Sequence, residues 1–328
     1  MRHLITGGAG FIGSHLAEAL LARGNQVLIL DDLSTGRLDN VEHLQGGGRV
    51  EFVKGSVSDE GLVDECMLSA DDCFHLASTV GVKLVVSQPL ASLLDDVRGV
   101  RTVVEAAARH DVRKIYTSTS EIYGKRSDGY VHEASDRLLG SPTIARWNYA
   151  TAKSFGEALV HGYHRERGAE MTTVRIFNTV GPRQAGAYGM VLPRFVSQAL
   201  AGEDLSVYGE GMQSRCFSHV ADTVDALIRV MDSDSAVGGT FNIGCDREMR
   251  IIKLAEQVIA RTGSESAIRL VPYEDAYGEG FEELGCRKPD TTRLREVTGW
   301  EPSRTIEDAI EDAIEYQREQ LAAVETVA

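Results

Sequence analysis

The segment R-H-L-I-T-G-G-A-G-F-I-G, Arg2–Gly13, joins a short apolar strand to a glycine-rich turn. The residues that follow predict a helix at Ile12–Ala22 and a second strand at Gln26–Leu30. Glycines at this spacing allow a tight turn, close approach of the backbone to a pyrophosphate, and close packing of helix on strand. The helix N-terminus favours the phosphate charge. We therefore predict a dinucleotide site, with a purely structural turn as the alternative, at the three glycines Gly7, Gly10 and Gly13.

An acidic pair, Asp31-Asp32, ends the second predicted strand. Asp31 follows the last glycine by about 20 residues, the spacing at which a carboxylate accepts hydrogen bonds from a ribose 2′-hydroxyl. The same carboxylate would repel a 2′-phosphate. The sequence therefore predicts NAD, rather than NADP, as the cofactor.

Strands and helices alternate through the first half of the chain, which predicts an α/β fold: a doubly wound parallel Rossmann sheet with helices on both faces. The predicted strands are Val50–Val53, Asp72–His75, Arg113–Tyr116 and Met171–Phe177, and the long helices are Leu90–His110 and Tyr149–Arg167. The rhythm changes after Asn178. Helices are expected at Met190–Ala201, Val220–Met231, Ile251–Thr262 and Ile306–Leu321. We expect an NAD-binding domain of residues 1–177 with returning segments at 218–244, and a smaller α/β substrate domain of residues 178–217 and 245–328.

The composition excludes several classes of partner. The 34 lysines and arginines against 49 aspartates and glutamates give a net charge of −15, which opposes binding to nucleic acid or to an anionic membrane. The apolar runs are too short to span a membrane, and Met1 leads directly into a strand, so no signal peptide is expected. Five scattered cysteines without a C-x-x-C motif favour reduced thiols in a cytoplasmic protein, with no metal site.

A second segment, Thr117–Lys153, opens with T-S-T-S-E-I-Y-G and closes with R-W-N-Y-A-T-A-K. On a helix, Tyr149 and Lys153 lie at i and i+4 and share a face. A tyrosine has a pKa near about 10. A neighbouring ammonium group and a cationic nicotinamide ring would lower that pKa and make Tyr149 a base, with Thr119 as its hydroxyl partner. The Y-x-x-x-K spacing also occurs by chance on amphipathic helices.

These motifs together resemble the extended short-chain dehydrogenase/reductases that modify nucleotide sugars. The resemblance covers almost the whole chain and rests on several segments: Thr6–Gly13, Asp31-Asp32, His75-Leu76-Ala77-Ser78, Thr119-Ser120-Glu121, Tyr149 with Lys153, Asn178, Gly181-Pro182-Arg183, Arg215 and Arg287-Lys288-Pro289-Asp290. It implies a Rossmann domain with a C-terminal sugar-nucleotide domain. It also implies a homodimer formed through the helices at Leu90–His110 and Tyr149–Arg167.

The resemblance also implies roles for individual residues. Tyr149 would be the base at the sugar C4 hydroxyl, Lys153 its partner, and Thr119 the hydroxyl that holds the C4 oxygen. The implied cofactor contacts are Gly7, Gly10, Phe11, Ile12, Gly13, Asp31, Asp32, Ser56, Ala77, Asp96, Tyr149 and Lys153. The implied substrate contacts are Lys83, Thr119, Asn178, Arg183, Arg215 and Arg287. Two positions depart from the family: Ser56 replaces an aspartate common near adenine, and Asp96 replaces an asparagine usual in 4-epimerases.

The branches of this family differ in their chemistry after C4 oxidation, and Thr119-Ser120-Glu121 is where they diverge. The Ser120-Glu121 pair with an arginine such as Arg215 suits decarboxylation of a UDP-glucuronate, in which the C5 enolate must be protonated. A 4-epimerase needs no acid at C5, and a 4,6-dehydratase usually carries an Asp-Glu pair. The expectation is a UDP-glucuronate decarboxylase. UDP-glucose or UDP-glucuronate 4-epimerisation, 4,6-dehydration, and a non-catalytic NAD-binding regulator remain open. Glu121 has the alternative of only pairing with a nearby cation, and Arg215 that of only binding phosphate.

Overall fold

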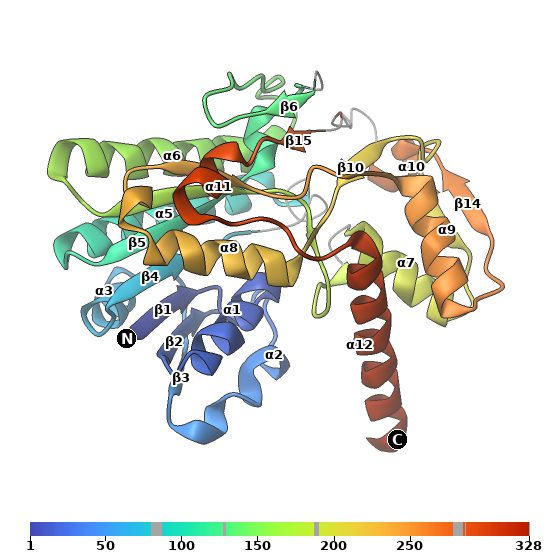
Figure 1. Ribbon diagram of the computed structural model, residues 1–328, viewed down its shortest axis with the longest axis horizontal. Helices are drawn as coiled ribbons and strands as arrows, with labels where there is room; N and C mark the ends of the chain where they lie inside the picture. Colours follow the sequence, from blue (N-terminus) through green and yellow to red (C-terminus); the bar gives the residue numbers. More distant parts are fainter. Residues whose placement is uncertain (80–86, 127–128, 187–189, 278–284, 286, 328) are drawn as a thin grey trace.

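The computed structural model describes residues 1–79, 87–126, 129–186, 190–277, 285 and 287–327 (Figure 1). Its main feature is a seven-stranded parallel sheet with the strand order β12-β7-β5-β4-β1-β2-β3. The strands are β1 (Arg2–Thr6), β2 (Gln26–Asp31), β3 (Val50–Lys54), β4 (Asp72–His75), β5 (Arg113–Thr119), β7 (Met171–Ile176) and β12 (Thr240–Ile243). The order reverses between β1 and β4, so the carboxyl ends of these two strands border the crevice in which such sheets bind ligands.

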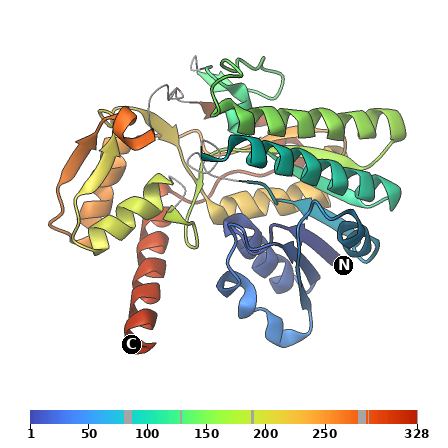
Figure 2. The same cartoon turned by 180° about the vertical axis from the view of Figure 1, so that it is seen from behind.

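Helices cover both faces of the sheet (Figures 1 and 2). One face carries α1 (Phe11–Ala22) and α8 (Val220–Asp232), and the other carries α3 (Glu60–Leu68), α5 (Pro89–Arg109) and α6 (Trp147–Arg167). Side chains alternate along a strand, so Ile5 packs beneath α1 and α8 whereas Leu4 packs beneath α5 and α6. Strands buried on both faces explain the continuous apolar runs in the sequence.

A smaller lobe has its own apolar core, which includes Leu192, Phe195, Leu254 and Ile310. It contains α7 (Val191–Leu200), β9 (Leu205–Tyr208), α9 (Ile251–Thr262), β14 (Ile268–Val271), α10 (Tyr273–Tyr277) and the C-terminal helix α12 (Ile306–Val327). Strands β9 and β14 pair in parallel. Short strand pairs link β10 (Ser214–Cys216) with β13 (Glu248–Arg250), β11 (Ser218–His219) with β8 (Thr179–Val180), and β15 (Lys288–Pro289) with β6 (Tyr130–Val131). Between α10 and α12 the chain returns to the large sheet, where α11 (Thr292–Thr298) packs on β12 and α8.

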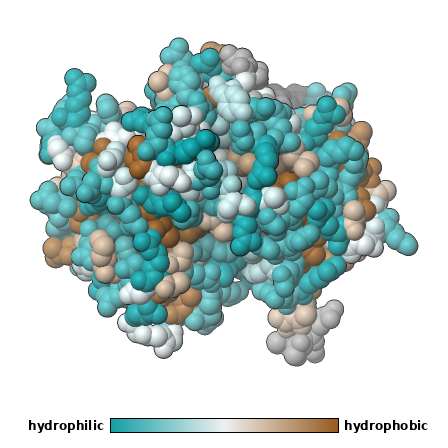
Figure 3. Space-filling view, viewed as in Figure 1, coloured by the Kyte–Doolittle hydropathy of each residue, from teal (hydrophilic) through white to brown (hydrophobic). Residues whose placement is uncertain are grey.

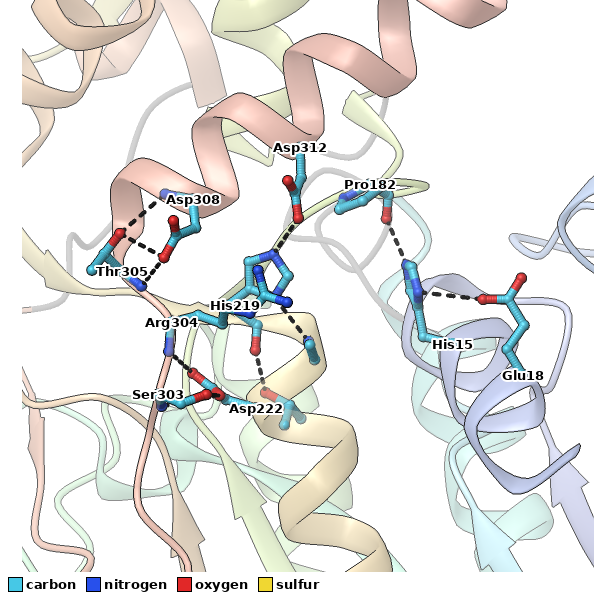
Figure 4. A network of polar contacts seen from close by, with 12 residues as sticks. His15, Glu18, Pro182, His219, Asp222, Ser303, Arg304, Thr305, Asp308 and Asp312 are labelled. Carbon is cyan, nitrogen blue, oxygen red and sulfur yellow. Dashed lines mark hydrogen bonds and ion pairs between the residues drawn. The ribbon is translucent and has the colours of Figure 1, made fainter. Parts of the chain in front are cut away.

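A polar network joins the large sheet to the C-terminal segment (Figure 4). His219 precedes α8 and accepts from Ala221 N–H at its Nδ1, while its Nε2 lies 3.0 Å from Asp312 of α12. Asp222 in the first turn of α8 accepts from the backbone N–H groups of Ser303 and Arg304, at 3.1 and 2.9 Å. The His219 ring gives an acceptor to the Ala221 N–H, which the first turn of α8 leaves without a helical partner. The bonds to Asp222 fix the segment that leads into α12.

The fold class expected from the sequence is confirmed, and most element bounds agree within two residues. Strand β5 extends through Thr119, beyond the predicted end at Tyr116, because Thr117 donates its hydroxyl to His75 O at 2.8 Å and is satisfied inside the sheet. Helix α3 is not among the helices predicted from the sequence. Hydrophilic side chains dominate the face drawn in Figure 3. Among the described helices, none has the length and apolar character that crossing a membrane requires.

Candidate active site

The glycine-rich turn sits at the reversal of strand order, between the ends of β1 and β4. Gly7 has φ +72°, and a Cβ there would lie 2.7 Å from Ala77 N, so the two strand ends approach at a distance that only glycine permits. A Cβ at Gly13 would collide with Gly7 O, so α1 also packs directly on the turn. Thr6 Oγ1 lies 2.7 Å from His75 Nδ1 and accepts from Ala77 N–H at 3.3 Å.

The first N–H groups of α1, at Phe11 and Ile12, have no partner within the helix, because they belong to its first turn. No acidic side chain occupies that turn. The turn therefore suits a pyrophosphate, and its residues fit the phosphate-bearing part of a dinucleotide.

Asp31 ends β2 next to this turn and is buried. Its carboxylate accepts from Ala9 N–H at 2.9 Å and from Leu33 N–H at 2.8 Å, so it braces the glycine-rich turn. Burial raises the pKa of Asp31, and the two backbone donors oppose that shift. Neighbouring Asp32 is exposed and accepts from Ser34 N–H at 2.9 Å, and Ser56 lies after β3 and accepts from Ser58 N–H at 3.1 Å.

Three residues of the predicted base site are brought together by β5 and α6. Thr119 is the last residue of β5, and Tyr149 and Lys153 lie on one face of α6. The Thr119 side chain opposes the rise that burial causes in the pKa of Tyr149. Lys153 is buried; its Nζ donates to Thr117 O at 2.8 Å and lies 5.8 Å from the centroid of the Tyr149 ring. The spacing in the sequence therefore corresponds to a real cluster.

The electrostatics of this cluster differ from the expectation. Burial, followed by the charges of Asp96 and Glu121, raises the pKa of Tyr149 above its ordinary value. Burial also lowers the pKa of Lys153 to about 8, against the opposing charges of Asp96 and Glu157. The chain by itself therefore does not lower the pKa of Tyr149, contrary to the prediction. The loss of hydration on burial outweighs the effect of the Lys153 ammonium group one helical turn away.

Glu121 is the acidic residue of the cluster and lies in a 3₁₀ turn, η2 (Ser120–Tyr123). Its N–H donates to Thr119 Oγ1 at 3.2 Å, which places it beside the Thr119 hydroxyl. Glu121 Oε1 lies 3.5 Å from Nη2 of Arg146, whose side chain is 7% exposed. Arg146 precedes α6, where a cation is disfavoured by the helix dipole. The buried guanidinium of Arg146 nevertheless lies next to Glu121. Ser120, the residue before Glu121, is also buried.

Ser78 and Asp96 complete the cluster from two other elements. Ser78 follows β4, donates its hydroxyl to Asp96 Oδ1 at 3.0 Å, and opposes the rise that burial causes in the pKa of Tyr149. Asp96 lies on α5. Ser78 belongs to the motif His75-Leu76-Ala77-Ser78, but the sequence alone predicted no role for it. Its position directly after the carboxyl end of a buried strand was the signal that could have found it.

Residues predicted near the nucleotide of the substrate lie on neighbouring segments of the smaller lobe. Asn178 donates its amide to Cys216 O at 3.1 Å, next to Arg215 on β10. Arg287 is buried and precedes β15, which packs beside β10. Arg183 instead donates to Glu18 of α1 at 2.5 Å, while His15 Nε2 lies 3.1 Å from Pro182 O, so this segment fastens the smaller lobe to α1. The predicted contact Lys83 lies outside the described residues.

Comparison with known proteins gives consistent results. The sequence model of the family described as GDP-mannose 4,6 dehydratase matches residues 4–313. A UDP-N-acetyl-alpha-D-glucosaminuronate decarboxylase of Bacillus cytotoxicus is 40% identical over 97% of this chain and 98% of its own length. UDP-glucuronic acid decarboxylase 1 of Xenopus tropicalis is 34% identical over 98% of this chain and 73% of its own length.

Solved structures agree on the fold. UDP-glucose 4-epimerase of Thermotoga maritima, with UDP-glucose, has a TM-score of 0.87, 28% identity, and coverage of 98% of this chain and 100% of that chain. The dTDP-glucose 4,6-dehydratase of Streptomyces venezuelae, with NAD bound, has a TM-score of 0.88, 27% identity, and coverage of 97% of both chains. Because an epimerase and a dehydratase match equally well, the fold alone does not distinguish the reactions.

Proposed function

The chain belongs to the extended short-chain dehydrogenase/reductase family of NAD-dependent nucleotide-sugar epimerases and dehydratases, and from this premise we propose that it decarboxylates a UDP-linked hexuronate. The observation that carries the proposal is Glu121, held beside Thr119 and next to the buried Arg146. An acid at this point serves a proton transfer at C5. Decarboxylation requires that transfer and direct 4-epimerisation does not.

The reaction begins at C4. NAD⁺, held by the glycine turn and Asp31, would supply reversible acceptance of a hydride. Tyr149 takes the C4 hydroxyl proton, Thr119 holds the C4 oxygen, and Lys153 places a positive charge beneath the site. General-base catalysis of this kind contributes about 10²–10⁴-fold. The 4-ketone that results is β to the C6 carboxylate.

Loss of CO₂ then breaks the C5–C6 bond, and the bonding electrons form an enolate between C5 and C4. In this proposal Glu121 delivers the proton that C5 must receive. Its ion pair with Arg146 supports the role, because the guanidinium offsets the charge of Glu121 and of an incoming carboxylate. The cofactor would return the hydride to C4, and Tyr149 gives its proton back to the C4 oxygen. The net change is a UDP-hexuronate and one proton converted to a UDP-pentose and CO₂.

UDP-glucuronate is the substrate proposed first, and the relative at 40% identity favours a second candidate that carries an acetamido group at C2. The relatives named as UDP-glucuronic acid decarboxylases are 33–35% identical. The two sugars share the C4 hydroxyl and the C6 carboxylate, so the same residues serve both.

The test is turnover in D₂O with UDP-glucuronate, its 2-acetamido analogue and UDP-glucose, read by mass spectrometry and proton NMR. We expect loss of CO₂ from a uronate and deuterium at C5 of the product. A product of unchanged mass without deuterium at C5 would establish 4-epimerisation instead, and loss of water would establish dehydration. No turnover and no NADH formation with any sugar would favour a non-catalytic regulator.

Glu121→Gln separates the roles within the site. The substitution is nearly isosteric and removes the exchangeable proton donor. We expect it to retain NAD and C4 oxidation, and to lose CO₂ release or deuterium uptake at C5. A variant that decarboxylates at the native rate would remove Glu121 from the mechanism.

A further inference from the structure

Two buried polar side chains are neighbours on the last two strands of the large sheet. Asn242 on β12 and Arg175 on β7 are partners in the parallel register of these strands. The residues beside them, Val174 and Phe241, pack in the core beneath α1 and α8. Because side chains alternate along a strand, Arg175 and Asn242 point to the opposite face, toward α6. There they are only 7% and 0% exposed.

Tyr123 bridges these two side chains. It ends η2, the 3₁₀ turn that contains Glu121, and it is fully buried. Its hydroxyl accepts from Arg175 Nη1 at 2.9 Å and donates to Asn242 Oδ1 at 2.7 Å. A guanidinium can only donate, so the single proton of the phenol belongs to the bond with Asn242. The turn is thus held at its end by Tyr123 and at its start by the bond from Glu121 N–H to Thr119.

Asn242 extends the connection to the segment that the sequence predicts to contact the nucleotide. Its Nδ2 donates to Val131 O at 2.9 Å and to Asp290 O at 3.1 Å, so both amide hydrogens are used. Asp290 follows β15 and lies three residues after the buried Arg287. One side chain on the edge strand therefore joins the turn of Glu121 to the segment of Arg287.

Arg175 ties the same turn to the helix of the predicted base. Its Nε and Nη2 donate to the two carboxylate oxygens of Glu157, at 2.9 and 2.7 Å. Glu157 lies on α6, one turn after Lys153. The remaining nitrogen, Nη1, donates to Tyr123 and also to Glu133 O at 2.9 Å. Each guanidinium nitrogen has an acceptor, and a buried polar network in which partners are satisfied fixes the elements that it joins.

We propose that Tyr123 and Asn242 are positioning residues for the protonation of C5, because their hydrogen bond holds the turn of Glu121 in place relative to the Arg287 segment. The proposal rests on the proposed decarboxylation. C5 and the diphosphate belong to one substrate molecule. An acid that is held relative to the nucleotide site is therefore also held relative to C5 once the substrate is bound. Catalysis by positioned groups is sensitive to displacements of about 1 Å.

The C4 site has an anchor of its own. Lys153 Nζ donates to Thr117 O at 2.8 Å, and Tyr149 lies one turn before Lys153 on α6. Loss of the bond between Tyr123 and Asn242 should therefore leave C4 oxidation in place and slow the step at C5. This separation distinguishes a positioning role from a general loss of structure, which would impair both steps together.

Tyr123→Phe is the conservative test, because it keeps the ring in the core and removes only the hydroxyl. We expect kcat for CO₂ release to fall by about 10–10²-fold with KM unchanged, and the absorbance of bound NADH to appear during turnover, because oxidised sugar waits for the step at C5. Thr172→Val is the matched control. It also removes one buried hydroxyl, which donates to Ala236 O at 3.0 Å near the start of β7, and it should behave as the native protein. Native kcat in Tyr123→Phe, or a loss of kcat without NADH, would overturn the positioning role.

A second measurement needs no turnover, and so separates failure here from failure of the proposed function. Asn242→Ala also removes the bond to Asp290, which holds the segment after Arg287. Calorimetric titration with UDP should show binding weakened by about tenfold in Asn242→Ala, and native affinity in Tyr123→Phe and Thr172→Val. Native affinity for UDP in folded Asn242→Ala would refute the link to the nucleotide segment. This result decides the link even if the native protein releases no CO₂, the outcome that would refute the proposed function.

Discussion

Replacing Lys114 with methionine should stabilise the protein. Lys114 lies on β5, is 0% exposed, and its Nζ has no hydrogen-bond partner among the described residues. It lies 5.9 Å from the centroid of the Tyr116 ring. Burial, reinforced by the charge of Lys153, lowers the pKa of Lys114 from 10.5 to about 7. Methionine keeps the length of the apolar stem and removes the amine.

The sign of the pH dependence follows from proton binding. Between pH 7 and the unfolded pKa the unfolded chain binds more protons at this residue, so the free energy of unfolding rises with pH. A folded pKa of about 7 and an unfolded value of 10.5 correspond to a destabilisation of about 4 kcal/mol at pH 7 and about 2 kcal/mol at pH 9. For comparison, replacing a buried ion pair by well-packed apolar residues is often neutral or stabilises a protein by about 1–4 kcal/mol.

Urea unfolding of the native protein and Lys114→Met across this pH range is the assay. We expect the variant to be more stable by about 1–4 kcal/mol at pH 7, and the gap to shrink by about 2 kcal/mol by pH 9. Taking the difference between the two proteins cancels other titrating groups. Lys54→Met, at the exposed end of β3, is the matched control and should show no gap that depends on pH. A Lys114→Met protein that is less stable at pH 7, or a gap that widens with pH, would refute the reasoning.

Three further predictions concern the site and the assembly. Tyr149→Phe should fold normally and lose activity by about 10²-fold or more, measured as kcat; near-native turnover would remove Tyr149 as the base. Asp31→Ala should weaken NAD binding and relax discrimination against NADP. It should also cost about 1–3 kcal/mol of stability, because Ala9 N–H loses its acceptor. Calorimetric titration with both cofactors and urea unfolding would test this, and tighter binding of NADP than of NAD by the native protein would contradict it. Phe155, 41% exposed on α6, is proposed to lie in a homodimer interface; Phe155→Glu should elute as a monomer in size-exclusion chromatography, and a native protein that is itself monomeric would exclude the interface.

Features that depend on local geometry could be read from the sequence. The glycine spacing requires a turn whatever surrounds it, and the i, i+4 spacing places Tyr149 and Lys153 on one face of any helix. The alternation of strands and helices was sufficient to predict the parallel sheet, since such strands must be covered on both faces. The hydroxyl-rich end of β5 was less readable, because its polar residues are satisfied by partners such as His75, which is distant in sequence.

The tertiary structure decided what depends on contacts between distant segments. Arg146 meets Glu121, and Asp96 meets Ser78, only because β4, β5, α5 and α6 converge at one end of the sheet. The direction of the pKa of Tyr149 was set by burial, which the neighbouring Lys153 does not overcome. Lys114 reads in the sequence as an ordinary charged residue of a strand; it becomes a buried amine because α5 and α6 cover that face of the sheet. Sequence spacing determines which side chains share a surface, whereas the loss of water that shifts their pKa values exists only once the layers have packed.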